Sequence, residues 1–336
     1  MTTRAATHAN SWYSGVRDTL NSQLDSWLEA VGDNIDQVPL PVPTARIIIA
    51  PHAGYSYSGP AAAWAYKSLD LSKAKRVFIL GPSHHVYMDG CALSACTTYQ
   101  TPLGNLAIDT ETIASLQTTG PFQSMNLRVD EEEHSIEMHL PYVYKMIERA
   151  GKLGGIKVVP IMVGSISTMK EKLYGEALAS YLQNPENCFV ISSDFCHWGS
   201  RFSYTHYYPE LPSTTQQFPQ SISLSRSNPP PRGSVKIYES IEALDRQGMA
   251  AIESGSHDNF SNYLKKTHNT ICGRHPIGVV MAGLEVIWDV VQGAGKFKFV
   301  RYEQSSRVKD PSDSSVSYAS AYAICAPDLD TFHGVY

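Results

Sequence analysis

Histidines follow three short apolar runs of this sequence, at the positions where the runs end. His52 follows the run Ala45–Ala50, and His84 and His85 follow the run Arg76–Leu80. His197 follows the run Cys188–Ile191. Since the chain of 336 residues holds 12 histidines, a third of them gathered at run ends points to a shared task. Clustered imidazoles bind transition metals or transfer protons. The pattern therefore predicts a metal or acid–base site.

His52 and His84 are the best ligand candidates. Each follows a turn that contains Pro or Gly, and such a turn lets the backbone leave a strand abruptly and aim a side chain inward. His85 is next to His84 in the chain, so it points to the other side if the local backbone is extended. We therefore do not expect both residues to bind one ion.

Two pairs of residues have the i, i+3 spacing of an imidazole with its carboxylate. Asp194 precedes His197, so its carboxylate would fix the tautomer of that ring and form an acid–base pair with it. His134 precedes Glu137 on the same face of an expected helix and would act as a base. The spacing is not H-E-x-x-H, which excludes a zinc peptidase of that type. We expect the acidic run Asp130–Glu133 to be a solvated helix start.

Cys272 directly precedes a tight turn, bracketed by Gly273 and Pro276, that leads into an expected helix. A helix N-terminus lowers the pKa of a thiol, so Cys272 would be a nucleophile or a soft metal ligand. A buried thiol in a capping turn fits the local sequence equally well. None of the six cysteines forms a C-x-x-C pair, so we expect neither a zinc ribbon nor a disulfide framework.

The elements that must position these residues alternate between strands and helices. Four continuous apolar runs suit strands that are buried on both faces: Ala45–Ala50, Arg76–Leu80, Ile156–Val163 and Cys188–Ile191. Helical spacing is found in Ser14–Val31, Pro60–Leu69, His134–Ala150, Met169–Leu182, Ile237–Glu253 and Pro276–Val291. Antiparallel strands are expected over Lys296–Tyr302 and Ser315–Cys325.

This order predicts an α/β fold, a single domain with a central, largely parallel or mixed sheet flanked by helices. Ligands of such sheets collect outside the carboxyl ends of the strands, so the histidines should meet on one rim. We treat residues 1–336 as one domain. Within it, residues 207–233 are rich in Pro and Ser, include Pro229-Pro230-Pro231, and predict a long surface loop or disordered insertion.

Composition excludes several classes of protein. The net charge is −5, which gives no basic footprint for nucleic acid or an anionic membrane. The longest apolar stretch, Ile277–Val291, contains Glu285 and Asp289 and is too short to cross a bilayer. Because Met1–Asn10 lacks an apolar region, we expect no signal peptide. We therefore expect a soluble, cytoplasmic protein, with the nucleus as a second location.

Five motifs, in order along the chain, resemble the Memo family (mediator of ErbB-driven cell motility). They are Pro51–Tyr55, Leu80–His85, Glu133–Pro141, Ser192–Gly199 and Asn269–Ile277. The likeness extends from Ser11 to Ala319, which is nearly the whole chain. The segment 207–233 looks longer than the corresponding loop of the family.

The resemblance implies a fold similar to that of class III extradiol dioxygenases, the LigB-like group, and a metal site. His52, His84 and Cys272 would be its ligands, with iron the first candidate ion, copper the second and zinc less favoured. Asp194 and His197 would line the same pocket, with His134 near it. The family is associated with redox activity, cell motility signalling and the binding of phosphotyrosine peptides.

Three functions remain open. The first is a metal-dependent oxidoreductase, with His197, Asp194 and His134 as its catalytic residues. The second is a non-catalytic metal protein that binds a phosphotyrosine or aromatic peptide, and the third is a metallohydrolase that uses a metal-bound water. A cysteine ligand makes the site softer than two His and one carboxylate, and a thiolate is oxidisable, so we do not expect ring cleavage. The residues assigned to a substrate or peptide pocket are Tyr55, His85, Glu137, Trp198 and His275, with Tyr57 and Tyr142 as further aromatic groups.

Overall fold

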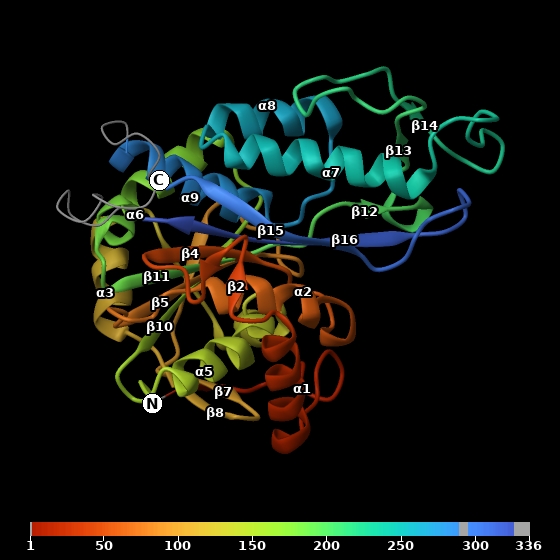
Figure 1. Cartoon of the computed structure of the whole chain (residues 1–336). Coiled ribbons are helices and arrows are strands. Elements are labelled where there is room, and N and C mark those ends of the chain that lie inside the picture. Colours follow the sequence, from red (N-terminus) through yellow and green to blue (C-terminus); the bar gives the residue numbers. More distant parts are fainter. Residues whose placement is uncertain (1, 289–294, 326–336) are drawn as a thin grey trace.

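Four parallel strands form the centre of a nine-stranded mixed sheet (Figure 1). The computed structural model describes residues 2–288 and 295–325. The central strands lie in the order β4 (Ala45–Ala50), β11 (Asn187–Ser192), β5 (Arg76–Pro82) and β10 (Lys157–Val163), and each pairs in parallel with its neighbour. Their carboxyl ends therefore meet at one edge of the sheet, as the sequence predicted.

Antiparallel pairs flank this parallel centre on both sides. Strand β16 (Ser315–Ile324) pairs with β4 and also with β15 (Phe297–Gln304) and the short β12 (His197–Trp198). On the other side β6 (Cys91–Ser94) is antiparallel to β10 and pairs with β9 (Gln123–Met125). The fold is thus α/β with a mixed sheet, and the expected antiparallel strands near the C-terminus are confirmed.

Helices cover both faces of the sheet (Figure 1). One face carries α1 (Arg17–Ala30), α2 (Tyr55–Ser68) and α5 (Leu140–Arg149), and the other carries α6 (Thr168–Gln183) and α9 (Arg274–Trp288). Helices α7 (Ile237–Glu253) and α8 (His257–Thr267) pack outside α9 and β15. Gly175 allows α6 to approach α9 closely, because a Cβ there would lie 2.6 Å from the backbone nitrogen of Gly283.

Smaller elements complete the described chain. They comprise a second sheet of β1 (Thr3–Arg4), β7 (Thr98–Thr101) and β8 (Gly104–Ala107), the pairs β2 (Asn34–Ile35) with β3 (Val38–Pro39) and β13 (His206–Tyr207) with β14 (Ile222–Ser223), helices α3 (Thr110–Thr119) and α4 (Leu127–Glu132), and two 3₁₀ turns, Glu137–His139 and Ser200–Phe202.

Two predicted helix starts were wrong. Helix α2 begins at Tyr55 and not at Pro60, because the Tyr55 N–H donates to the carbonyl of Trp12, a partner far away in the sequence. The helix expected from His134 begins at Leu140, after a 3₁₀ turn, and Pro141 occupies its first turn, where proline is favoured. The end of the expected helix Pro276–Val291 lies outside the described residues from 289 on.

The segment 207–233 is only partly the surface loop that its composition predicted. Strand β13 at its start pairs with β14, and the side chains of Tyr207, Tyr208 and Leu224 are buried. The Leu224 N–H also donates to the carbonyl of Thr205. The segment therefore contributes to the core at two places and is exposed between and after them.

Shortening the buried leucine of this segment should destabilise the whole domain. Leu224 is 3 % exposed, so Leu224→Ala should lower the free energy of unfolding by about 2–4 kcal/mol, as Leu→Ala changes in cores do. Leu211→Ala is the matched control, since Leu211 lies in the same segment but is 49 % exposed. Urea unfolding measures both variants. Equal stability of the two would show that the segment is only a surface insertion.

Candidate metal centre

Three side chains from distant parts of the chain converge at the carboxyl edge of the sheet. His52 follows β4, His84 follows β5, and Cys272 lies in the turn before α9. One ligand atom from each lies within 4.8 Å of the other two. This separation is comparable with twice the length of a metal–nitrogen or metal–sulfur bond, about 2.1–2.3 Å. The structure thus brings together the three residues that the sequence singled out as one group able to hold a metal ion.

The tautomer of His52 is fixed by Ser192, the last residue of β11. The Ser192 hydroxyl donates its hydrogen to the carbonyl of Ser135, at 2.8 Å, so its oxygen accepts from Nδ1–H of His52, at 2.6 Å. The Nε2 atom of His52 is therefore unprotonated and lies 3.4 Å from Sγ of Cys272. Burial and the neighbouring imidazole of His84 lower the pKa of His52, which keeps its ring neutral.

Glu133 fixes His84 in the same tautomer. Its carboxylate accepts from Nδ1–H of His84 at 2.9 Å and from the backbone N–H of His84 at 2.6 Å. It also accepts from the backbone N–H groups of His134 and Ser135. Burial alone raises the pKa of Glu133, but the hydrogen bonds and charge of His84 outweigh it, and the pKa is about 2. A carboxylate can only accept, so Nδ1 of His84 carries a proton, and in the neutral ring Nε2 carries the lone pair.

Cys272 is held against the end of β11. Its Sγ accepts from the backbone N–H of Asp194 at 3.2 Å. The following Gly273 packs so closely on Ser192 and Ser193 that a Cβ would collide with both. Burial and the charge of Asp194 raise the pKa of the Cys272 thiol, so the thiol keeps its proton. A bound cation reverses this preference, because coordination deprotonates a thiol.

His134 lies beside this group and contacts it through stacked rings. Its imidazole stacks on His84 at 4.5 Å and on Trp12 at 4.3 Å between centroids. Burial and the charge of His84 lower the pKa of His134 to about 3. His134, His84 and Glu133 form a second group able to hold a metal. We favour the group with Cys272, because the Glu133 carboxylate is already engaged by four N–H groups.

Asp194 does not orient His197 in the way that their spacing predicted. The Asp194 carboxylate accepts from the backbone N–H of His52 at 2.9 Å. Nδ1–H of His197 donates instead to the carbonyls of Phe195 and Thr270, at 2.9 and 3.1 Å. Backbone carbonyls therefore fix the tautomer of His197, which leaves its Nε2 unprotonated as a base. In its protonated form His197 is near enough to contribute to the lowered pKa of His52.

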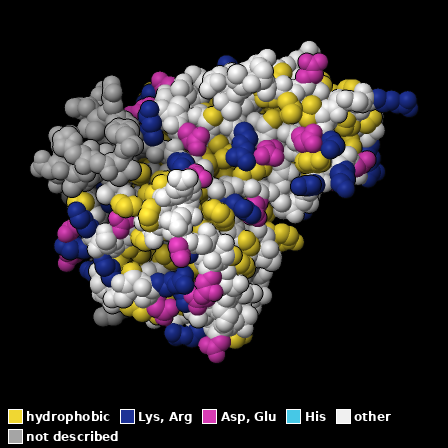
Figure 2. Space-filling model, in the orientation of Figure 1, with side chains coloured by type: hydrophobic (Ala, Val, Ile, Leu, Met, Phe, Trp, Pro, Cys, Tyr) yellow, Lys and Arg dark blue, Asp and Glu magenta, His cyan; other side chains and the backbone are white. Residues whose placement is uncertain are grey.

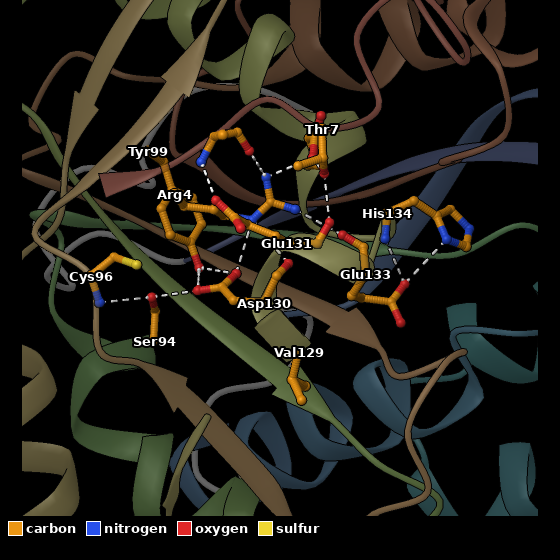
Figure 3. A network of polar contacts seen from close by, with 12 residues as sticks. Arg4, Thr7, Ser94, Cys96, Tyr99, Val129, Asp130, Glu131, Glu133 and His134 are labelled. Carbon is orange, nitrogen blue, oxygen red and sulfur yellow. Dashed lines mark hydrogen bonds and ion pairs between the residues drawn. The ribbon is translucent and has the colours of Figure 1, made fainter. Parts of the chain in front are cut away.

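Glu137 does not orient His134 either, and the acidic run before it is only partly solvated, because Asp130 and Glu133 are buried whereas Glu132 is exposed. Glu137 is fully buried and accepts hydrogen bonds from Arg4, His8 and Tyr13, at 2.6, 2.9 and 2.7 Å. Arg4 also donates to the buried Asp130 carboxylate at 3.0 Å, as Figure 3 shows. The expectation failed because the cation that compensates these carboxylates lies more than 120 residues away in the sequence.

The expected pocket residues are divided between the core and the site. Trp198 and Tyr142 are fully buried core residues, and Tyr55 is buried with its hydroxyl bonded to the carbonyl of Met138, so the expected aromatic rim is wrong at these positions. Nδ1–H of His275 donates to the Glu171 carboxylate on α6 at 2.6 Å. His85 is exposed, with its ring centroid 5.9 Å from that of His134.

Sequence reasoning missed Ser192, Glu133 and Trp12 as parts of the site. Ser192 lies at the end of a predicted strand, on the same rim as the histidines. The reasoning that selected His52 from its position after a strand could therefore have selected Ser192 as well. Glu133 was hidden in an acidic run that looks solvated. Trp12 gave no signal, because its approach to His134 depends on the path of the N-terminal segment over the site.

Comparison with known proteins identifies the family of this chain. A family model described as Memo-like protein matches residues 4–322. The chain is 47 % identical over 326 residues to Protein MEMO1 of Danio rerio, which covers 96 % of this chain and 98 % of that protein. The chain belongs to the Memo family.

Further Memo relatives show the same extent of similarity. Protein MEMO1 of Homo sapiens is 46 % identical over 317 residues, covering 94 % of this chain and 96 % of that protein. Protein memo-1 homolog of Caenorhabditis elegans is 42 % identical over 329 residues, covering 97 % and 84 %. All the site residues named above lie within the matched range 4–322.

A solved structure gives a weaker likeness. The crystal structure of an uncharacterized Escherichia coli K12 protein is 14 % identical, with a TM-score of 0.44, and covers 81 % of this chain and 98 % of that one. This similarity is too weak to support a conclusion about the fold family, so the likeness to extradiol dioxygenases stays a prediction. Within residues 2–288 and 295–325, no helix is long and apolar enough to span a membrane.

The buried Arg4–Glu137 pair of this Memo protein should make its stability depend on pH. Burial alone raises the pKa of Glu137, but the hydrogen bond from His8 and the charge of Arg4 bring it to about 2. A depressed pKa stabilises the fold above the unfolded value of 4.5, and this contribution is lost as pH falls from 4.5 towards 2. Glu137→Gln should therefore cost about 3 kcal/mol at pH 7 and less as pH falls below 4.5.

Urea unfolding at a series of pH values measures this effect. Glu132→Gln is the control, since Glu132 pairs with the exposed Arg128 on the surface of α4. A cost for Glu137→Gln that stays constant from pH 7 down to the acid limit of the fold would contradict the assignment of a charged, paired Glu137.

Proposed function

We propose that this Memo protein is a metal-binding redox protein. Nε2 of His52, Nε2 of His84 and Sγ of Cys272 would hold one transition-metal ion. The observation that carries the proposal is the convergence of these three atoms within 4.8 Å, together with the hydrogen bonds that place the proton of each neutral imidazole on Nδ1 and the lone pair on Nε2. A neutral imidazole with a free lone pair is the form that ligates metals, and its outer partner fixes that form.

The donor set suits a redox-active ion. Two imidazoles and a thiolate are softer than the two-histidine, one-carboxylate set of non-haem iron oxygenases, and they bind iron, copper or zinc. Following the resemblance to the Memo family, we propose iron as the resident ion and copper as the second candidate, with zinc less favoured. Ring cleavage is not part of the proposal, because the Cys272 thiolate would be oxidised by repeated turnover with oxygen.

The remaining residues would bind and orient a small substrate beside the ion. A redox-active ion in this place would supply one-electron exchange with that substrate. His197 would accept a proton at Nε2, since its Nδ1–H is bound by two backbone carbonyls. Asp194 would hold the backbone of His52 in place. His134, with a pKa of about 3, would stay neutral and contribute stacking and a hydrogen-bond acceptor.

A second candidate is a non-catalytic protein that binds metal and an aromatic or phosphotyrosine peptide, linked to cell motility signalling. Exposed aromatic side chains favour it. Trp12 stacks on His134 yet is 37 % exposed, and Tyr57, at the start of α2, is 60 % exposed. A metallohydrolase has no comparable observation in its favour. All six cysteines are free, which suits a reducing compartment, so we propose a cytoplasmic location.

Replacement of the thiol should remove the metal without unfolding the protein. Cys272→Ser and His52→Ala should each lower the metal content of anaerobically purified protein at least about tenfold, since each removes one of three ligands. Cys188→Ser is the matched control, because this buried thiol donates to the Asp70 carbonyl and a hydroxyl can replace it there. Elemental analysis with circular dichroism measures the outcome. Unchanged metal in Cys272→Ser would refute the ligand role of the thiol.

Turnover separates the two candidate functions. If the protein is an oxidoreductase, the metal-loaded wild type should consume superoxide, or oxygen with a reductant, and His52→Ala should lose this activity together with the metal. His197→Gln should keep the metal and slow the reaction at least about tenfold, within the range for loss of a general base. Metal binding without any consumption would favour the peptide-binding candidate, and hydrolysis of a model ester without a redox change would favour a hydrolase.

A further inference from the structure

Three consecutive prolines, Pro229–Pro231, lie on the surface in the loop between β14 and α7. Pro229 and Pro231 are exposed and Pro230 is half-buried, and the next residue, Arg232, is exposed. The loop projects from the end of the molecule at which β13 and β14 lie (Figure 1). The metal centre uses none of these residues.

The prolines have little conformational freedom. The ring of proline fixes its φ near −65°, and a residue that precedes proline is confined to extended or polyproline II backbone. Asn228, Pro229 and Pro230 each precede a proline, so extended or polyproline II backbone is favoured over these three residues. In the part of the chain that the structure describes, the carbonyls of Pro229 and Pro230 accept no hydrogen bond, which leaves them available to a partner.

Both ends of the proline run are anchored to the domain. On the upstream side, Ser225 and Asn228 exchange two backbone hydrogen bonds, at 3.0 and 3.1 Å, directly after the buried Leu224. On the downstream side, Ser234 donates to the Pro231 carbonyl, and the Ser234 hydroxyl also bonds to the buried Tyr207. The run is therefore held in one conformation before any partner arrives, which lowers the entropy lost on binding.

Positive charge follows the proline run. Arg232 makes no ion pair with any carboxylate among the described residues, whereas the exposed Lys236, four residues on, pairs with Glu239 at 3.4 Å. Figure 2 shows Lys and Arg side chains projecting at this end of the molecule, beside exposed hydrophobic side chains. A complementary surface would combine an aromatic slot for proline rings with a carboxylate for Arg232.

We propose that Pro229–Arg232 is a docking segment for a small domain with one aromatic slot, of the WW type, that takes adjacent prolines followed by arginine. Polyproline II ligands dock in aromatic-lined grooves because they are preformed. SH3 domains prefer a second proline three residues after the first, but the residues at that distance from Pro229, Pro230 and Pro231 are Arg232, Gly233 and Ser234. The segment therefore suits a domain with a single aromatic slot and lacks the second proline that a domain with two slots would need.

Titration of the full-length protein with purified domains tests the proposal. The probes are a panel of WW domains selected for Pro-Pro-Arg ligands and, for comparison, SH3 domains selected for Pro-x-x-Pro. We expect at least one WW domain to bind with a dissociation constant on the order of 10–100 μM, typical of small transient contacts, and the SH3 domains not to bind. Isothermal titration calorimetry measures the affinity, and NMR of the labelled domain locates the contact.

Single substitutions identify the segment. Pro230→Ala and Arg232→Glu should each weaken binding about tenfold or more, equivalent to about 1.4 kcal/mol. Pro219→Ala, in the same surface segment but outside the run, should bind like the wild type. Thermal melts confirm that the variants fold. No binding by any WW domain of the panel, equal binding by Pro230→Ala, or preference for an SH3 domain would overturn the proposal. Metal content is measured in parallel and should not change, so the outcome is independent of the proposed redox function.

Discussion

The lone pairs on Nε2 of His52 and His84 depend on two side chains that would not touch a metal themselves. Ser192 and Glu133 accept the Nδ1 protons, and each is held by further hydrogen bonds, Ser192 to the Ser135 carbonyl and Glu133 to three backbone N–H groups. Without these acceptors either ring could rotate or change tautomer. The parallel strands bring the imidazoles to one edge of the sheet. The hydrogen bonds then leave the lone pair of each neutral ring on Nε2, the atom that would bind the metal.

The N-terminal segment is tied to the same region through a buried network. Arg4 lies between the carboxylates of Asp130 and Glu137, and the carbonyl of Glu133 accepts from the same guanidinium at 2.9 Å. Figure 3 shows Arg4, Asp130, Glu133 and His134 as neighbours in one network of polar contacts. Loss of this cation would leave two buried carboxylates uncompensated. Since Glu133 also holds His84, the network that orders the N-terminus supports a proposed metal ligand.

Sequence alone predicted the central strands almost to the residue, because runs such as Ala45–Ala50 are apolar on both faces and end at Pro or Gly. It also located His52 and His84 on one rim, and the family resemblance added Cys272. It failed where the partner is distant in sequence. Local spacing assigned Asp194 to His197 and Glu137 to His134, whereas in the fold these carboxylates serve His52 and Arg4. Spacing within one element does not reveal a partner that lies more than 100 residues away in the sequence.

Anomalous diffraction at the iron and copper absorption edges, from crystals grown without added metal, tests the central claim most directly. The account predicts one peak bounded by Nε2 of His52, Nε2 of His84 and Sγ of Cys272, stronger above the iron edge than below it, or above the copper edge if copper is the resident ion. A peak bound by Glu133 and His134 without Cys272, or the absence of any peak among these three atoms, would contradict it.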